Sequence, residues 1–271
     1  TSATAYGATE TVDALGFLGR RPQFDDFADG GGDDIRDSEI DVLNGLAKLG
    51  WNAGESHRFE LSGSWYEDEG TTPPNANAAA SATNVVDREG RVATARAGWD
   101  YAPAGSDWLD VSTLLYFNDY RIEEDRDFDG RTDETLYRTF GAEIVNRSRF
   151  DAGLPVTLVY GVEGYRDAQE GRRDGAARGE FPDASVDFYA AFAEATIMAT
   201  DTLEIVPGVR VDRYVLDPEG AFEDRSETAV SPRLGLSWRP ADGLQIFGNV
   251  ARAFRAPSLT ELYTDGVHFS T

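Results

Sequence analysis

The chain has 271 residues, enough for one large domain or two small ones, and a net charge of -24. Binding to nucleic-acid phosphates needs clustered Lys and Arg, so this acidic balance argues against a nucleic-acid partner. The absence of cysteine excludes disulfides, zinc–thiolate sites and cysteine nucleophiles. No run of about 18 apolar residues occurs, so no transmembrane helix is expected. The opening residues lack the basic and apolar regions of a signal peptide.

Alternation of apolar and polar residues is the strongest pattern in the chain. In the stretch HRFELSGSWY, Phe59, Leu61 and Trp65 point one way, while Arg58 and Glu60 point the other. This period of two predicts β-strands with one apolar face, and no helical periodicity is convincing. In chain order, the predicted strands lie near 40–52, 57–66, 86–100, 108–120, 134–149, 155–167, 185–199, 203–214, 230–240 and 243–255.

The predicted strands fit two architectures. Many exceed ten residues, whereas strands of soluble proteins usually have about five or six. A soluble β-sandwich would place the charged faces in water and the apolar faces in its core. A membrane barrel would do the inverse, with lipid outside and a polar lumen. Alternation alone does not separate the two architectures.

The connections between the predicted strands favour the barrel. Short ones, near 52–56, 102–107, 151–155, 199–202 and 240–243, alternate with long ones, near 68–85, 122–134, 167–185 and 217–228. Outer-membrane barrels combine short periplasmic turns with long extracellular loops in this way. Four tryptophans that flank the short turns suit an interfacial aromatic girdle: Trp51, Trp99, Trp108 and Trp238. The predicted fold is therefore all-β, a transmembrane antiparallel β-barrel.

One acidic connection resembles a calcium-binding loop. Asp125, Asp127 and Asp129 alternate before Gly130, and Asp133 follows at the ninth position. Alternation converges carboxylates and glycine permits a sharp turn, so the pattern predicts a calcium ligand set. The twelfth position holds leucine instead of the usual glutamate. A solvated acidic hairpin is the alternative interpretation.

No arrangement of residues indicates catalysis. The chain has two histidines, far apart in the sequence, and no cysteine. A Ser-His-Asp triad or a metal hydrolase therefore has little support, and we expect a protein that is not an enzyme.

The region SPRLGLSWRPADGLQIFGNVARAFRAPSLTELY resembles the TonB-dependent outer-membrane receptors, as does the upstream TLEIVPGVRVDRY. Within that family, FRAPSLTELYTDGVHF is most similar to the haem and haemoglobin receptors. Those carry a Phe-Arg-Ala-Pro box, here Phe254 to Pro257, followed by an extracellular loop with a haem-ligating histidine. The resemblance assigns that role to His268, whose neutral imidazole suits haem iron. The second box of these receptors, Asn-Pro-Asn-Leu, is not within residues 1–271.

Two further residues of this segment are candidate ligand contacts. Tyr263 offers an alternative oxygen ligand or a rim aromatic. Arg255 faces the lumen by the alternation of its strand, where it would pair with an acidic wall residue or attract a haem propionate. Pro257 has no N–H to donate, so the strand ladder is expected to stop there.

The resemblance also implies the domain organisation and the partners. Residues 1–20 resemble the end of a plug domain, 21–39 read as a linker or loop, and 40–271 form part of a barrel of about 22 strands. The implied function is energised uptake of haem through the outer membrane of a Gram-negative bacterium, with haemoglobin as one source of the haem. The TonB complex, haem or a haemoprotein, and outer-membrane lipid would be the partners. A siderophore or other metal-chelate receptor, a passive pore and a soluble β-sandwich are the alternatives.

Overall fold

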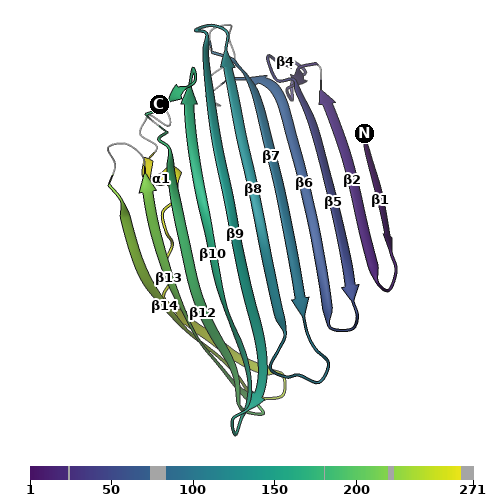
Figure 1. Cartoon of the computed structure of the whole chain (residues 1–271), viewed down its shortest axis with the longest axis vertical. Helices are drawn as coiled ribbons and strands as arrows, with labels where there is room; N and C mark the ends of the chain where they lie inside the picture. The colour runs from purple at the N-terminus through teal and green to yellow at the C-terminus, as the bar shows by residue number, and fades with distance from the viewer. Residues whose placement is uncertain (24, 74–83, 180, 219–222, 264–271) are drawn as a thin grey trace.

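One large antiparallel sheet dominates the computed structural model, which describes residues 1–23, 25–73, 84–179, 181–218 and 223–263. The sheet has thirteen strands, and each long strand pairs with the next one along the chain (Figure 1). The strands β3 and β4 form a separate ribbon between β2 and β5. The elements are β1 (Ser2–Ala8), β2 (Val12–Gln23), β3 (Phe27–Ala28), β4 (Asp34–Ile35), β5 (Ile40–Ala53), β6 (His57–Thr72), β7 (Val86–Tyr101), β8 (Val111–Arg126), β9 (Arg131–Asp151), β10 (Pro155–Arg173), β11 (Ala176–Ala177), β12 (Ala184–Thr200), β13 (Leu203–Pro218), β14 (Arg225–Ala241), β15 (Leu244–Ala251) and α1 (Leu259–Tyr263).

All ten predicted strands are present, as β5 to β10 and β12 to β15. Their register explains why period two is so clear. Leu49, Leu61 and Leu115 lie in one row across the sheet, with Ala97 between the last two. Because successive side chains point to opposite faces, the neighbouring positions form a row on the other face. That row contains Lys48, Ser62, Arg96 and Tyr116.

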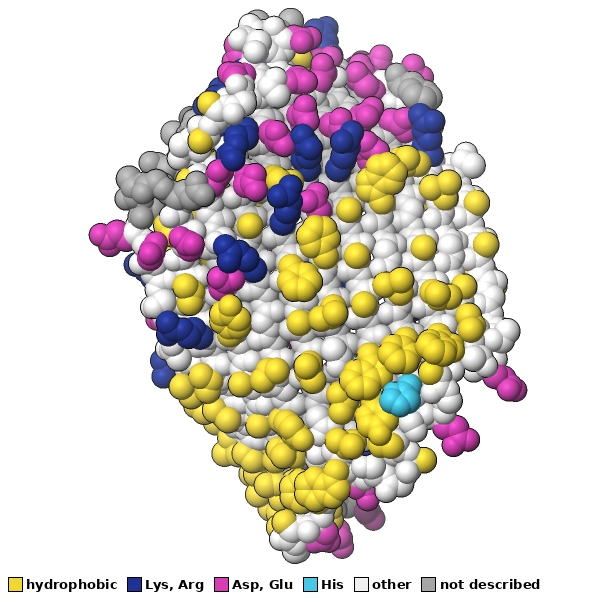
Figure 2. All heavy atoms as spheres, viewed as in Figure 1, with side chains coloured by type: hydrophobic (Ala, Val, Ile, Leu, Met, Phe, Trp, Pro, Cys, Tyr) yellow, Lys and Arg dark blue, Asp and Glu magenta, His cyan; other side chains and the backbone are white. Residues whose placement is uncertain are grey.

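The two faces of the sheet therefore differ in chemistry. The apolar face carries a broad band of exposed hydrophobic side chains, such as Leu61 at 60% and Val162 at 53% exposure. Figure 2 shows this band with charged residues beyond it at the upper end. Within the described residues no second sheet covers the band, since the only other sheet is the β3–β4 ribbon. A β-sandwich would bury such a band, so that alternative is wrong.

The two ends of the strands also differ. The connections β1–β2, β5–β6, β7–β8, β9–β10, β12–β13 and β14–β15 lie at one end, here called the turn end (Figure 1). The other connections lie at the opposite end, here called the loop end. The expected long connection near 122–134 is wrong: β8 and β9 stay paired up to Arg126 and Arg131, which leaves only residues 127–130 between them.

Aromatic residues gather on the apolar face near the turn end. Trp51 stacks on Phe59 with ring centroids 5.5 Å apart. His57 stacks between Trp99 and Tyr101, at 6.1 and 4.6 Å. The indole Nε1 of Trp99 donates a hydrogen bond of 3.2 Å to Nδ1 of His57, and Figure 2 shows this histidine among hydrophobic side chains. The prediction of an aromatic group beside the short turns is consistent with this arrangement.

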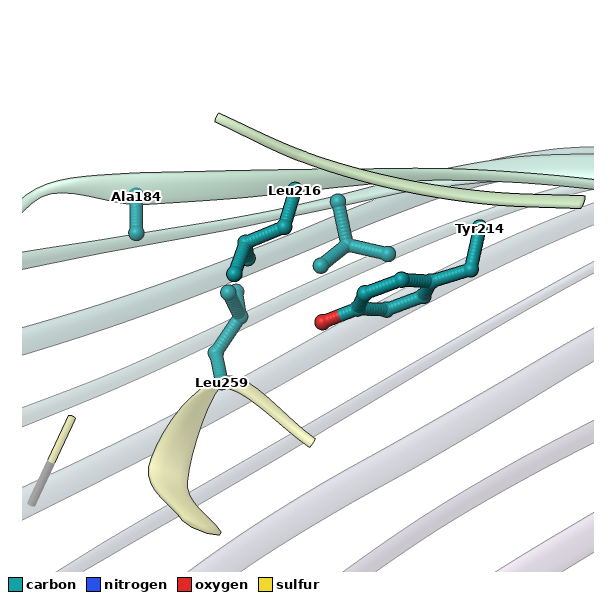
Figure 3. Close-up of a cluster of buried hydrophobic side chains, with 5 residues drawn as sticks. Ala184, Tyr214, Leu216 and Leu259 are labelled. Atoms are coloured by element: carbon teal, nitrogen blue, oxygen red, sulfur yellow. The ribbon is translucent and has the colours of Figure 1, made fainter. Parts of the chain in front are cut away.

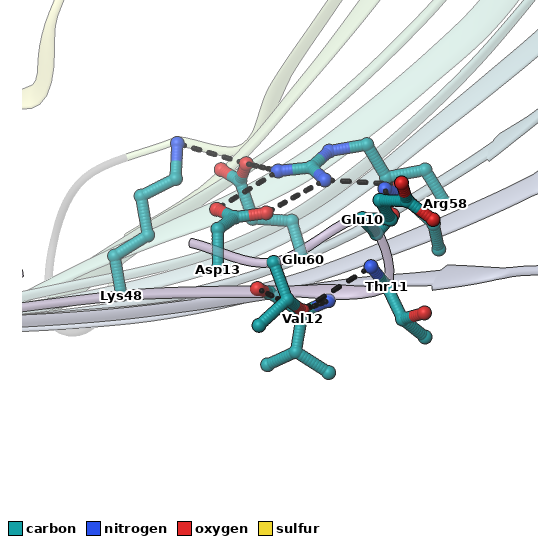
Figure 4. A network of polar contacts seen from close by, with 9 residues as sticks. Glu10, Thr11, Val12, Asp13, Lys48, Arg58 and Glu60 are labelled. Carbon is teal, nitrogen blue, oxygen red and sulfur yellow. Dashed lines mark hydrogen bonds and ion pairs between the residues drawn. The ribbon is translucent and has the colours of Figure 1, made fainter. Parts of the chain in front are cut away.

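The first twenty residues differ from the expected end of a plug domain. They form β1 and most of β2, and β2 pairs with β5 from Val12 to Gln23. Asp13 accepts hydrogen bonds of 2.9 and 3.2 Å from Arg58 on β6, and Lys48 pairs with Glu60 at 2.8 Å beside them (Figure 4). These contacts reach across three strands of the polar face. The segment is therefore part of the same sheet.

The single described helix is α1, which has five residues. None of the described helices is long and apolar enough to cross a membrane.

Candidate functional site

The segment after β15 leaves the sheet and turns back over it. The last ladder hydrogen bond of this segment joins the Arg252 N–H to the Pro232 carbonyl at 3.0 Å. The ladder was expected to run on to Pro257, but it stops five residues earlier. Residues 252–258 have no regular secondary structure, and α1 follows them.

A reciprocal capping arrangement fixes the start of α1. The Ser258 hydroxyl accepts a hydrogen bond of 3.2 Å from the Glu261 N–H. The Glu261 carboxylate in turn accepts one of 2.9 Å from the Ser258 N–H. This is a capping box, which satisfies two N–H groups that a helix start otherwise leaves without partners. The sequence Ser-Leu-Thr-Glu thus explains why a helix begins at Leu259.

Arg255 is tied to the same helix. Its two terminal nitrogens donate hydrogen bonds of 2.9 and 2.8 Å to the two carboxylate oxygens of Glu261. A bidentate pair of this kind fixes orientation as well as distance. The hydrogen bonds from Arg255 and Ser258 lower the pKa of Glu261 to about 2. Arg255 does pair with an acid, but the partner belongs to its own segment and not to the barrel wall.

One side chain anchors this segment to the sheet. Leu259 is 6% exposed and packs in a buried cluster with Ala184, Val186, Tyr214 and Leu216. Figure 3 shows Leu259 reaching from α1 toward the strands that carry these residues. The partners occupy register positions of the polar face, since Tyr214 lies in the same row across the sheet as Tyr116. The segment therefore docks on the polar face, which lines the lumen in a barrel of this type.

A cavity of about 320 Å³ lies beside this anchor. Its wall on the sheet includes Tyr137, Tyr165, Asp167 and Tyr214, and residues 256–259 close the other side. Asp167 accepts a hydrogen bond of 2.7 Å from the Thr139 hydroxyl. Phenol and carboxylate oxygens thus meet apolar surface in one partly open cavity, as is usual for ligand sites. The sequence interpretation missed these wall residues, whose only signal was their place at alternate strand positions.

The polar face carries a charge network farther toward the turn end. The Arg210 guanidinium donates hydrogen bonds to Glu163 and, at 2.6 Å, to Asp212. It also lies 5.8 Å from the centre of the Phe188 ring and 5.9 Å from that of Phe192. Charges of both signs therefore line this face, whereas the middle of the opposite face is apolar.

Two of the predicted site residues lie at the margin of the described structure. Tyr263 is the last residue of α1. His268 lies outside the described residues, and so do the other residues from 264 onward. Arg255 and Tyr263 are thus placed on one docked segment, and the predicted role of His268 stays a prediction.

The structure does not bring the predicted calcium ligands together. Asp125 faces Thr132 across the β8–β9 hairpin and accepts a 2.6 Å hydrogen bond from its hydroxyl. Asp133 belongs to the opposite face, where arginines surround it. In the described part of the chain, the single group of three or more metal-binding side chains within reach of one ion is Glu67, Glu69 and Glu89. Asp125 and Asp133 lie on opposite faces of the hairpin, and Asp127 and Asp129 lie in the turn between β8 and β9. The described structure therefore does not group these four carboxylates, and calcium binding there stays a prediction.

A comparison with protein families agrees with the sheet and its two faces. Residues 18–270 match the family model described as TonB dependent receptor-like, beta-barrel. The chain belongs to this family, and its sheet is part of such a receptor barrel.

Curated relatives refine this family placement. A hemin receptor of Yersinia enterocolitica is 30% identical over 276 residues, which covers 99% of this chain and 39% of that protein. The heme/hemopexin utilization protein C of Haemophilus influenzae (strain 86-028NP) is 25% identical over 89% of this chain and 40% of that protein. The chain thus spans about two fifths of the length of the curated relatives it matches.

Solved structures agree with the fold. The hemophore receptor HasR of Serratia marcescens, in complex with its hemophore HasA and heme, has a TM-score of 0.80 and 24% identity, and covers 98% of this chain and 44% of that chain. The copper transporter OprC has a TM-score of 0.76 and 19% identity, and covers 97% of this chain and 46% of that chain. Both identities lie below 25%, so these two structures support the architecture alone.

Proposed function

We propose that this chain is the part of an outer-membrane receptor that takes up haem, either free or from a haemoprotein. The observation that carries this proposal is the 30% identity to a hemin receptor over 99% of the chain. The same relation supports a place in the outer membrane of a Gram-negative bacterium. An open sheet edge in lipid would leave backbone groups unsatisfied, so β1 and β15 are expected to pair with further strands of a complete barrel.

The docked segment gives this function a structural basis. The Arg255–Glu261 pair, the capping box and the Leu259 anchor hold residues 255–262 on the lumen side, near the loop end. We propose that this arrangement presents the following residues, including Tyr263 and His268, to a ligand that enters from outside. Neutral imidazole is a suitable axial ligand for haem iron, and a tyrosine oxygen is a known alternative. Arg255 serves in this proposal as a positioning residue, because Glu261 already occupies its guanidinium.

Transport needs an energy source that the chain itself does not supply. We propose coupling to a TonB complex through a plug domain, because the family is defined by that dependence. A passive pore would conduct ions without such coupling. Ion conductance of the complete receptor in planar bilayers separates the two, since a plugged receptor stays closed and a passive pore conducts.

The direct test is haem capture by the complete receptor. In cells that have no other haem receptor, His268→Ala is expected to abolish growth on hemin as the iron source. The matched control is His57→Ala, at the turn end, which should leave growth unchanged. A haem receptor without its TonB partner should also fail to support growth. Wild-type growth of the His268→Ala strain would contradict the role of that histidine, and failure of the wild-type receptor to bind hemin would favour a siderophore or other chelate receptor.

A further inference from the structure

A group of arginines surrounds one buried carboxylate at the loop end of the polar face. Asp133 is 3% exposed and pairs with Arg173 at 2.8 Å, Arg131 at 3.1 Å and Arg126 at 3.6 Å. Arg178 adds a fourth positive charge, and its guanidinium donates a hydrogen bond of 3.4 Å to the Thr135 hydroxyl. Asp133 therefore lies at the centre of a group of positive side chains.

Three of these arginines, Arg126, Arg131 and Arg178, have more donors than the described contacts use. The Nε atoms of Arg126, Arg131 and Arg178 are shut off from water and have no hydrogen-bond partner within the described structure. Each guanidinium has five N–H donors, and Asp133 offers only two oxygens to the whole group. Glu124, which lies opposite Asp133 on β8, is a second carboxylate at this level of the face. The four guanidinium groups outnumber these two carboxylates, and Asp129 and Asp174 in the adjoining turns accept hydrogen bonds from the N–H groups of Arg131 and Thr132.

Aromatic rings lie directly below this group. The Arg178 guanidinium lies 5.4 Å from the centre of the Phe181 ring. Phe181 meets Tyr137 edge to face at 5.4 Å, and Tyr137 stacks with Tyr120 at 6.1 Å. Tyr137 also lines the cavity that residues 256–259 close. The arginines, the rings and the cavity therefore form one continuous strip of the polar face, from the loop end to the docked segment.

We propose that Arg126, Arg131 and Arg178 bind the carboxylates of an incoming planar aromatic ligand, whose ring system lies over Tyr137, the ring that also lines the cavity. This inference rests on the proposed function and names the part of the ligand that the arginines recognise. Guanidinium groups match carboxylates in shape and form short charge-assisted hydrogen bonds with them. The acidic loops elsewhere repel an anionic ligand, so a local positive group is needed to hold it. A ligand of the haem class has both required features, a flat ring and two carboxylates.

Two probes test this site in the complete receptor: hemin, and hemin dimethyl ester, in which both carboxylates are masked. Arg126→Gln and Arg178→Gln are each expected to weaken hemin binding about tenfold, because each removes a charge-assisted hydrogen bond. Ester binding should be equal in the variants and the wild type. Arg178→Lys, which keeps the charge, should recover part of the hemin affinity. Arg213→Gln is the matched control, since Arg213 lies on the opposite face and donates to Thr228.

The outcomes separate this proposal from the proposed function. The heat-modifiable migration of each variant on a gel first establishes that its barrel is folded. Unchanged hemin affinity in folded variants overturns the arginine site and leaves haem uptake intact. An equal loss of hemin and ester binding also overturns it, because the effect would then not depend on the carboxylates. If the wild-type receptor binds neither probe, the proposed function and the site that rests on it both fail.

Discussion

Different interactions stabilise the two ends of the strands. At the turn end, aromatic rings stack along neighbouring strands of the apolar face, as in Trp51 on Phe59 and His57 between Trp99 and Tyr101. At the loop end, ion pairs join separate hairpins, as between Arg173 on β10 and Asp133 on β9. On the apolar face, the turn end therefore depends on rings that the strand register places side by side. The loop end depends on charges that only the assembled sheet brings together.

This difference agrees with the proposed place of the ligand site at the loop end. Stacked rings beside short turns suit a membrane boundary, where one apolar surface must meet the headgroup region. Arginines held around a buried carboxylate can exchange hydrogen bonds with an incoming anion, which stacked rings cannot do. The comparison predicts that substitutions at the loop end have larger and more local effects than substitutions at the turn end.

The largest effect is expected for Asp133→Asn. Breaking a buried ion pair by removing one partner costs about 3 to 5 kcal/mol, because the remaining charges are left without compensation. The free energy of local opening of the β8–β9 hairpin should fall by about 3 kcal/mol, as measured by amide hydrogen exchange. Asp125→Asn is the control, since its carboxylate is exposed at the same hairpin, and it should change that value by less than about 0.5 kcal/mol. Equal effects of the two variants would contradict the buried role of Asp133.

Leu259→Ala is expected to have the next largest effect. Removing a buried leucine side chain costs about 2 to 5 kcal/mol, and a surface segment that can relax lies at the lower end of that range. The free energy of docking of the segment 255–262 should fall by about 2 kcal/mol. Amide hydrogen exchange at the Leu262 N–H measures this change, because that group donates a hydrogen bond to the Ser258 carbonyl. Leu262→Ala should cost less, because Leu262 is only partly buried against the cluster. Unchanged exchange in Leu259→Ala would show that the Arg255–Glu261 pair holds the segment without the anchor.

The sequence predicted the parts of the molecule that depend on local pattern. Period-two alternation located ten strands, β5 to β10 and β12 to β15, and the aromatic positions indicated the turn end. The motif Ser-Leu-Thr-Glu also encodes a capping box, although a helix was not predicted there. The ion pairs could not be predicted from this local pattern, because partners such as Asp13 and Arg58 meet across three strands. The spacing of Asp125 and Asp133 was equally uninformative, since the pairing of β8 with β9 decides which face each of them occupies.

A smaller effect is expected at the turn end for Trp99→Phe. The ring is retained, and only the 3.2 Å hydrogen bond to Nδ1 of His57 is lost. A neutral hydrogen bond contributes about 0.5 to 1.5 kcal/mol to stability. The coupling energy between Trp99→Phe and His57→Phe, from a double-mutant cycle on thermal unfolding in detergent, should therefore be about 1 kcal/mol or less. A coupling as large as the effect of Asp133→Asn would reverse the proposed ranking of the two ends.

The smallest effect is expected from mild acidification of the Arg255–Glu261 pair. Because the pKa of Glu261 falls from its ordinary 4.5 to about 2, this pair contributes its full stability above pH 4.5. The contribution should be lost only as the pH falls through about 2, so the segment stays docked between pH 7 and pH 5. Amide exchange at Ser258, corrected for the intrinsic effect of pH, measures this directly, since that N–H donates to Glu261. Arg255→Gln removes the main cause of the low pKa and should move the pH of undocking upward, toward 4.5. Undocking of the wild-type segment near pH 4.5 would show that Glu261 is not held as an anion by this pair, and that α1 relies on Leu259 alone.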